Sequence, residues 1–184
     1  AKALSVSLKK IGIDSILTRE PGGSAGAEII RKLLVEGDPN KWSPETEMLL
    51  FTAARRDHLE KTIEPGLREG KVVISDRYVD STRVYQGLTR GDLRQTVDKL
   101  HQLMIGKEPD LTFIIDMDPK EALYRGLARA SGEDRFEDFG LEFQLKLRNG
   151  FLELKNNFQQ RCHIIDGSKS SQQISLEILN IVNN

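Results

Sequence analysis

The sequence predicts an α/β protein of three layers (αβα), with a central parallel sheet between two layers of helices. Short apolar segments that suit buried strands alternate with longer segments of helical periodicity along the whole chain. Strands separated by helices need crossover connections, and such connections join parallel strands. Four strand segments are few for this architecture, so we expect the first strand to be missing and to belong before Ala1.

The composition is that of an ordinary globular domain. Of the 184 residues 38% are hydrophobic and 30% charged, and 27 Lys and Arg against 28 Asp and Glu leave a formal net charge of −1. This balance argues against nucleic-acid and membrane binding, and no apolar run approaches the ~20 residues that span a bilayer. Without a signal peptide or lipidation motif, we expect one domain over residues 1–184 in the cytoplasm.

In the first third of the chain, proline and glycine residues mark where the predicted helices and strands begin and end. Residues 1–11 have helical spacing, and residues 13–18 suit a short strand that runs into the sequence TREPGG at 18–23. Two glycines after a proline let the backbone approach a ligand closely. A helix is predicted over 25–34. Ser43 and Pro44 then suit the cap and first residue of another helix, which Pro65 should kink or end.

The rest of the chain continues the alternation. An acid and a proline at Asp118 and Pro119 predict a capped helix start, and the highly charged residues 131–138 are expected to form an exposed loop. Cys162, the single cysteine, is expected to pack in the core. The predicted strands are 72–75, 111–116 and 163–166, and the predicted helices are 92–105, 119–130, 139–158 and 172–182.

The stretch at residues 71–87, KVVISDRYVDSTRVYQG, is the strongest candidate for a site. Its apolar strand runs straight into Asp76 and Arg77. In open α/β sheets, ligands bind beyond the carboxyl ends of the strands. The alternative is that Asp76 caps the next helix and pairs with Arg77 on the surface. These two residues alone do not decide between the two interpretations.

Other strand ends carry charges of the same kind. Arginine forks bind phosphate and carboxylates hold Mg²⁺, so the set fits a nucleotide phosphate site at which catalysis is mostly positioning and charge neutralisation. Solvated surface charge is the favoured interpretation for any one arginine, and a weaker one for the whole set. The set comprises Arg19, Asp76, Arg77, Asp116 and Asp166, with Arg129 and Arg135 from a nearby loop.

A second group of residues suits a nucleoside. Phe51 and Arg55 are four apart on a predicted helix and share a face, so a ring that can stack on a base lies beside a fork that can bind its carbonyl. Alone, Phe51 is more often a core residue and Arg55 a solvated one. Thr82, Tyr85 and Gln86 follow Arg77 and could complete a pocket. No G-x-x-x-x-G-K-[ST] loop occurs, so pattern alone predicts a nucleotide-binding α/β domain and no more.

Five motifs together resemble the bacterial thymidylate kinases. They are TREPGG at 18–23, LLFTAARR at 49–56, DRYVDSTRVYQG at 76–87, PDLTFIID at 109–116 and DRFE at 134–137. They occur in the order and approximate spacing of that family over nearly the whole chain. The combination of TREPGG with DRY-x-x-S-x-x-x-Y-Q-G is specific, whereas any one motif alone is weak.

The resemblance implies the P-loop NTPase fold of the nucleoside monophosphate kinase type. It also implies transfer of the γ-phosphoryl group of ATP to dTMP with Mg²⁺, giving dTDP and ADP for dTTP synthesis, usually in a homodimer. The family's glycine-rich loop precedes the helix that matches residues 1–11. We expect the residues encoded upstream of Ala1 to carry that loop.

On the dTMP side, the resemblance assigns a role to each matching residue. Phe51 would stack on thymine and Arg55 would reach its carbonyl. Thr82 would contact the pyrimidine edge, with Tyr85 and Gln86 along the sugar and base. Ser81 belongs to the same segment of the motif.

The resemblance also assigns the phosphate end of this pocket. Arg19 and Arg77 would grip the dTMP phosphate, and Asp76 would orient the acceptor or a metal-bound water. Tyr85 near the sugar would disfavour a ribose 2′-hydroxyl by crowding.

On the ATP side, the resemblance implies a lid over residues of about 125–138. Arg125, Arg129 and Arg135 fall in this region, and Arg129 is the candidate for stabilising transition-state charge. Gly167 and Ser168 match a turn that touches adenine. Two alternatives stay open: a kinase for another nucleoside monophosphate, and a non-catalytic nucleotide-binding protein that lacks the donor loop.

Overall fold

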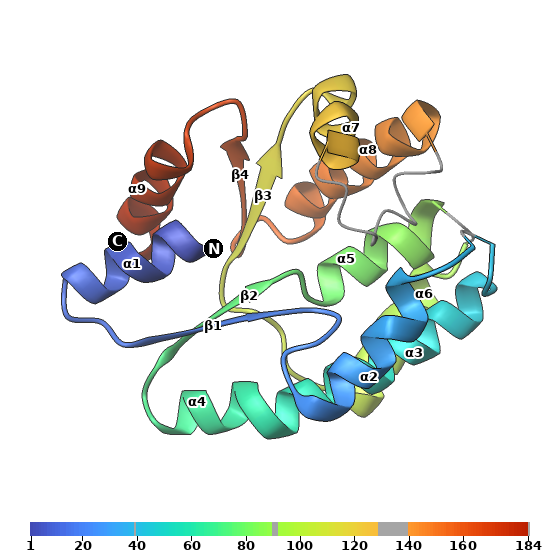
Figure 1. Ribbon diagram of the computed structural model, residues 1–184, viewed down its shortest axis with the longest axis horizontal. Coiled ribbons are helices and arrows are strands. Elements are labelled where there is room, and N and C mark those ends of the chain that lie inside the picture. Colours follow the sequence, from blue (N-terminus) through green and yellow to red (C-terminus); the bar gives the residue numbers. More distant parts are fainter. Residues whose placement is uncertain (39, 90–91, 129–139, 184) are drawn as a thin grey trace.

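The computed structural model describes residues 1–38, 40–89, 92–128 and 140–183 (Figure 1). Its strands are β1 (Ser15–Arg19), β2 (Val72–Asp76), β3 (Thr112–Asp116) and β4 (Cys162–Asp166). Its α-helices are α1 (Lys2–Lys10), α2 (Ala25–Val35), α3 (Pro44–His58), α4 (Glu64–Arg68), α5 (Val79–Val84), α6 (Arg94–Met104), α7 (Pro119–Ala128), α8 (Gly140–Asn157) and α9 (Ser171–Val182). Two π-helical turns, η1 (Leu59–Ile63) and η2 (Tyr85–Thr89), extend α3 and α5.

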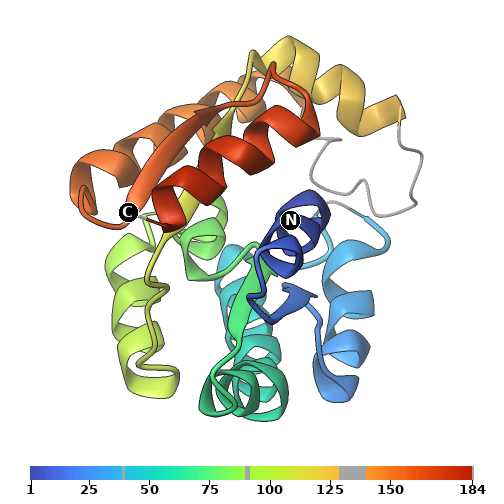
Figure 2. The ribbon, with the colours of Figure 1, turned by 90° about the vertical axis from the view of Figure 1, so that its left-hand side faces the viewer.

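The strands form two parallel pairs. β1 pairs with β2, and β3 pairs with β4. The last residues of each pair lie opposite each other, Arg19 beside Asp76 and Asp116 beside Asp166. In Figure 2 the β3–β4 pair lies above with α7, α8 and α9, and the β1–β2 pair lies below with α2, α3 and α4.

β2 and β3 are not hydrogen-bonded to each other, so the four described strands form two pairs and not one continuous ladder. A cavity of about 810 Å³ lies between them, lined by residues 72–77 of one pair and 111–117 of the other. Neighbouring strands must lie about 4.8 Å apart to form a hydrogen-bonded ladder. β2 and β3, which have the cavity between them, form no such ladder. The cavity is therefore the place in this fold that a further strand would fit.

Helices cover both faces of the strands, which confirms the three-layer architecture. Successive strand side chains point to opposite faces, so Val72 and Ile74 of β2 face one layer and Val73 faces the other. Helices α1 and α9 cover the first face, where they pack against β2, Phe113 and Ile165. On the opposite face, one cluster packs Val73 with η1 and α4, and a second packs β3 and β4 with α8 and α5.

The sequence predicted that Pro65 would kink or end the helix that begins at Pro44, and in the structure this helical segment does not end there. Ser43 caps it as expected, accepting a hydrogen bond from the backbone N–H of Thr46 at 3.2 Å. A proline inside a helix clashes with the carbonyl one turn back. The π-turn η1 lies directly before Pro65 and widens that turn, so helical structure continues to Arg68.

The segment after β2 is helical, which the sequence did not predict. Arg77 adopts φ 69°, a left-handed conformation that non-glycine residues seldom take, and the chain then turns directly into α5 and η2. α5 therefore presents Ser81 and Thr82 from a rigid element close to the end of β2.

A buried ionic network fixes α5 to its neighbours. Arg83 donates hydrogen bonds to Asp80 at 2.9 Å, to Asp98 of α6 at 2.7 Å and to Glu108 at 2.5 Å. Arg161, just before β4, donates to both carboxylate oxygens of Asp80, at 2.6 and 2.8 Å. Burial acts to raise the pKa of Asp80, but the bonds from Arg161 and Arg83 outweigh it and hold that pKa below its usual value.

No helix in the described part of the chain is long and apolar enough to cross a membrane.

Candidate functional site

Two of the sequence motifs meet where α3 packs against α5. Arg55 of α3 is only 3% exposed, and its Nη2 donates a hydrogen bond to the hydroxyl of Thr82, which is 2% exposed, at 3.0 Å. The guanidinium also lies over the ring of Tyr78, 5.2 Å from its centroid. The two predicted nucleoside-binding residues are therefore brought together, and the arginine is not solvated at the surface.

A second hydrogen bond joins the same two segments about two helical turns before Arg55 on α3. Glu47, eight residues before Arg55 on α3, accepts a hydrogen bond at 2.9 Å from Nε2 of the fully buried Gln86. Phe51 lies midway between Glu47 and Arg55 at i and i+4 spacing, so it shares their helix face toward α5 and η2. The Gln86 side-chain carbonyl oxygen is buried without a hydrogen-bond partner among the described residues.

The phosphate-binding candidates occupy the end of β2. Asp76, Arg77, Ser81 and Tyr85 all line the cavity between the strand pairs. Nη2 of Arg77 donates to the hydroxyl of Tyr85 at 3.2 Å, and its guanidinium lies 5.0 Å from that ring. The Ser75 hydroxyl donates to the Arg77 carbonyl at 2.7 Å, which supports the left-handed backbone there.

Arg19 lies at the end of β1, opposite Asp76, but it does not line the cavity. Its Nη2 donates to Glu28 in the first turn of α2 at 3.0 Å, and the Gly23 N–H donates to the same carboxylate at 3.0 Å. The Gly23 bond, followed by the Arg19 bond, lowers the pKa of Glu28. Glu28 thus ties the end of β1 to the TREPGG loop.

The second strand pair carries the turn predicted to meet adenine. Gly167 is buried, its N–H donates to the Asp116 carbonyl at 2.7 Å, and a Cβ there would lie 2.8 Å from that oxygen. The Ser168 hydroxyl donates to Asp166 at 2.7 Å. Asp116 lines the cavity and accepts two hydrogen bonds from Arg148 of α8, at 2.7 and 2.9 Å.

The arginines of the predicted lid are only partly described. Arg125 lies near the end of α7, is exposed and pairs with Glu121. Arg129 and Arg135 lie outside the described residues.

The described residues form no group of three or more His, Cys, Asp or Glu side chains that could hold a metal ion alone. Asp76 is the one predicted metal ligand; it is exposed and lines the cavity. Mg²⁺ is commonly bound through one or two carboxylates together with substrate phosphates and water. A single carboxylate at the strand end is compatible with that mode of binding.

Sequence reasoning missed several residues that position the site. Glu20 lies inside TREPGG and His58 lies three residues after Arg55, and nothing in their sequence context indicates a role for either. Both contact the Arg55 side of the pocket. Arg148 showed only as one charge on a helix. The signal that could have found Glu20 and Arg148 is that a buried or cavity-facing charge needs an opposite charge within reach.

Comparisons with known proteins agree with this arrangement. A family model described as thymidylate kinase matches residues 1–178. A thymidylate kinase of Dinoroseobacter shibae is 64% identical over 179 residues, covering 97% of this chain and 86% of the relative. One of Ruegeria pomeroyi is 58% identical over 182 residues, covering 99% and 86%.

A solved structure agrees as well. The crystal structure of thymidylate kinase from Ehrlichia chaffeensis, at 32% identity, matches with a TM-score of 0.75 over 98% of this chain and 87% of that one. Membership of a single family therefore explains the strand pairs, the helical layers and the matching motifs. The chain belongs to the thymidylate kinase family.

Proposed function

We propose that this protein transfers the γ-phosphoryl group of ATP to dTMP, giving dTDP and ADP. The observation that carries the proposal is the hydrogen bond between Arg55 and Thr82, which brings the LLFTAARR and DRYVDSTRVYQG motifs together at one place in the fold. Thymine offers ring carbonyls to an arginine fork and a flat face to a phenylalanine ring. Family membership and the pocket thus point to the same substrate.

The nucleoside is proposed to lie against the α3 face formed by Phe51 and Arg55. Phe51 stacks on the base, and Arg55 donates to a base carbonyl. Thr82 and Gln86 contact the pyrimidine edge, and the unpartnered carbonyl of Gln86 is an acceptor suited to a ring N–H. Thymine N3–H is such a donor.

The phosphate of dTMP is proposed to lie at the end of β2. Arg77 supplies the guanidinium fork, and Asp76 beside it orients the acceptor or a Mg²⁺-bound water. Arg19 approaches the same phosphate from β1 and would exchange its Glu28 partner for it. Ser81 and Tyr85 line the sugar side, where the tyrosine ring disfavours a 2′-hydroxyl by crowding.

The donor side is proposed to use the opposite strand pair. ATP would supply the phosphoryl group, and Mg²⁺ would neutralise phosphate charge, held by Asp76 and by phosphate oxygens. Gly167 fits an adenine-facing turn, because its backbone lies too close to Asp116 for any side chain. Ser168 follows it, and Arg125, Arg129 and Arg135 belong to a lid over residues 125–138 of a single domain. The protein would act in the cytoplasm, where its nucleotide substrates are found.

The substrate is tested by comparing dTMP, dUMP, dCMP and dGMP with ATP and Mg²⁺, measuring diphosphate formation, and by calorimetry of each monophosphate without donor. We expect dTMP to bind and react best, because only a base with a 4-carbonyl and N3–H pairs with both Arg55 and Gln86, and the 5-methyl group distinguishes dTMP from dUMP. Preference for another monophosphate would contradict the proposal. Binding of dTMP without any ATP binding or turnover would instead indicate a non-catalytic nucleotide-binding protein.

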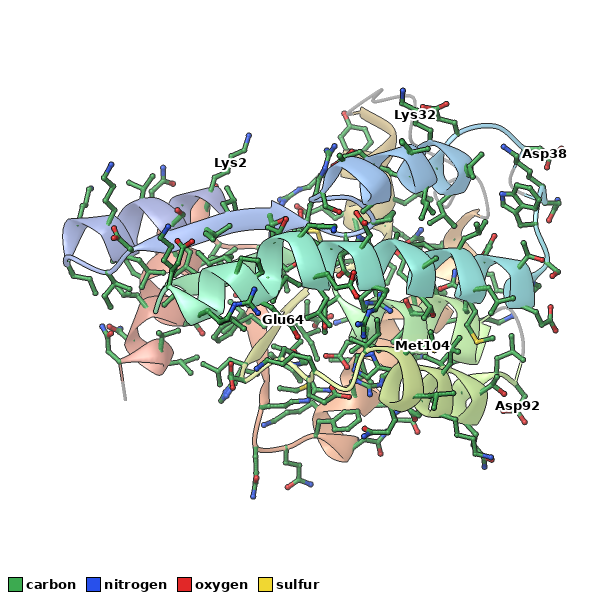
Figure 3. The ribbon with its side chains drawn as sticks, turned by 90° about the horizontal axis from the view of Figure 1, so that it is seen from below. Lys2, Lys32, Asp38, Glu64, Asp92 and Met104 are labelled. Carbon is green, nitrogen blue, oxygen red and sulfur yellow. The ribbon has the colours of Figure 1, made fainter. Side chains whose placement is uncertain are left out.

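We also propose that the protein is a homodimer. Helices α2, α3 and α6 lie side by side (Figure 3), and they expose large apolar side chains: Ile29 at 69%, Leu49 at 56% and Leu103 at 80%. Exposed apolar side chains gathered on neighbouring elements are typical of protein interfaces. The three helices are therefore the proposed contact face.

Replacing Leu49 by lysine should convert a dimer to a monomer, because the interface would have to bury an unpaired charge. Sedimentation velocity at micromolar concentration measures the change. Leu176→Lys on α9 is the matched control, since Leu176 is 58% exposed away from the proposed face. A wild-type monomer, or a dimer that survives Leu49→Lys, would overturn the proposed interface.

A further inference from the structure

A chain of buried hydrogen bonds lies behind Arg55, on the side away from Thr82. Oε2 of Glu20 accepts from Nε of Arg55 at 2.7 Å, and Oε1 of Glu20 lies 3.0 Å from Nδ1 of His58. Nε2 of His58 lies 2.7 Å from the hydroxyl of Thr18. Glu20 and Arg55 are each no more than 4% exposed, and His58 is fully buried. The chain joins the end of β1, the TREPGG loop and α3.

The chemistry of the carboxylate sets the direction of both bonds to Glu20. An ionised carboxylate can only accept, so Nδ1 of His58 carries the hydrogen that Glu20 accepts. Nε2 lies within hydrogen-bond distance of the Thr18 hydroxyl, which can either donate to this nitrogen or accept from it. The two oxygens of Glu20 are thus divided, one to the histidine and one to the arginine. Neither can rotate toward a new partner without breaking the other bond.

The TREPGG loop packs directly on this chain of hydrogen bonds. A Cβ added at Gly23 would lie 2.4 Å from Nε2 of His58 and 2.3 Å from Oγ1 of Thr18, and Gly23 has φ 84°. The loop backbone therefore leaves the imidazole no room to turn. His58 is held from three sides by Thr18, Glu20 and Gly23.

These contacts fix the plane of the Arg55 guanidinium. Nε is held by Glu20 and Nη2 by Thr82, and the flat face lies over the ring of Tyr78. Nη1 has no hydrogen-bond partner among the residues that the structure describes. An arginine fork discriminates between acceptors by direction as well as charge, so holding its plane decides which ligand atom Nη1 can meet.

We propose that Glu20 and His58 are positioning residues that aim Arg55 at the base of the nucleotide, and so set the preference for a 4-carbonyl over a 4-amino group. Thymine has the carbonyl and cytosine the amino group, which has no lone pair to offer a guanidinium. This inference rests on the proposed dTMP pocket. It adds two residues that act through Arg55 and touch no substrate.

Two replacements of His58 distinguish a role in orienting Arg55 from a role in packing alone. In His58→Asn the amide nitrogen takes the place of Nδ1 and can still donate to Glu20. In His58→Gln the amide reaches toward Thr18 instead and leaves Oε1 of Glu20 without its donor. Glu20→Gln removes the charge beside Arg55 at constant size. Ser175→Ala on α9 is the control, because Ser175 is 3% exposed, its hydroxyl lies 3.0 Å from that of Ser7, and neither residue contacts the chain to Arg55.

The readout is calorimetric affinity for dTMP and dCMP, with a thermal melt of each variant. We expect His58→Gln and Glu20→Gln to lower the dTMP:dCMP affinity ratio by about tenfold, the effect of one misdirected buried hydrogen bond. His58→Asn should retain more of the ratio than His58→Gln, and Ser175→Ala should lower the melting temperature without changing the ratio. A merely structural role would move the melting temperature and leave the ratio unchanged.

The outcomes also separate this inference from the proposed function. If Arg55→Ala loses the preference for dTMP but neither glutamine variant does, the positioning role is overturned and the pocket stands. If Arg55→Ala binds both nucleotides as the wild type does, the pocket assignment and this inference both fail. If Glu20→Gln does not fold, the comparison of His58→Asn with His58→Gln still tests the positioning role.

Discussion

Arg77→Ala is expected to lower kcat/KM for dTMP by about 100- to 1,000-fold, the usual effect of removing one charged group that stabilises a transferring phosphoryl group. The backbone of Arg77 is left-handed at φ 69°, its guanidinium lies over the Tyr85 ring, and both residues line the cavity. Backbone strain of this kind persists where the surroundings impose it, and it is concentrated at functional sites. The arginine is therefore placed for a ligand.

The measurement is dTDP formation with ATP and Mg²⁺, together with dTMP affinity by calorimetry, which does not depend on the donor. Arg77→Lys should fall between the wild type and the alanine variant, because lysine keeps the charge but loses the bidentate fork. The control is Arg68→Ala on α4, whose arginine is exposed and pairs only weakly with Glu64, at 3.5 Å. Unchanged rates and affinity in Arg77→Ala would remove Arg77 from the mechanism.

The sequence predicted the strand ends well, because their signal is local. Val72, Val73 and Ile74 are a continuous apolar run, and the charged pair after them marks the end of the strand. The same holds for Ser43 and Pro44 at the start of α3, where both residues act through bonds within one turn. Elements whose cause lies within a few residues were therefore predicted with nearly their observed bounds.

Features that depend on distant residues were not predicted. The partner of Arg55 is Glu20, 35 positions earlier, and nothing in the helix that carries Arg55 indicates it. The lack of pairing between β2 and β3 likewise depends on how elements far apart in sequence are placed in space. The π-turn before Pro65 is a local feature, but it shows only in the hydrogen-bond pattern and not in residue type.

The family resemblance supplied what residue patterns could not. Pattern alone left Phe51 as a core residue and Arg55 as a solvated one, and the structure now gives Arg55 two buried partners. The contacts also explain why the DST part of the motif follows the strand: Asp80 anchors α5, and Thr82 two residues later reaches Arg55. The anchoring residue and the pocket residue share one short helix, so the stability of the network and the shape of the pocket are coupled.

Asp80→Ala should lower the free energy of unfolding by about 3–5 kcal/mol, the cost of removing one partner from a buried ion pair. Asp80 is 4% exposed and accepts from both Arg83 and Arg161. Without it, two arginines converge on a position with no carboxylate. Urea unfolding followed by circular dichroism measures the change, and dTMP affinity should fall with it because α5 carries Thr82.

Asp98→Ala is the matched control, since Asp98 pairs with the same arginine at 2.7 Å but is 39% exposed. Water can replace an exposed partner, so this variant should cost no more than about 1 kcal/mol. If the two replacements lowered the free energy of unfolding equally, burial would not determine how much each ion pair stabilises the fold, and the prediction would be wrong.

Acid unfolding gives an independent check of the same network. The folded pKa of Asp80 lies below its unfolded value, so between the two the unfolded chain binds more protons and stability rises with pH. The contribution of Asp80 is thus complete above the usual aspartate pKa of about 3.9 and is lost as pH falls through the lowered folded value. Asp80→Asn cannot titrate, so its stability should fall less steeply than that of the wild type below pH of about 4. Identical slopes would mean that Asp80 keeps an ordinary pKa in the folded protein and that Arg83 and Arg161 do not hold it as a buried ion.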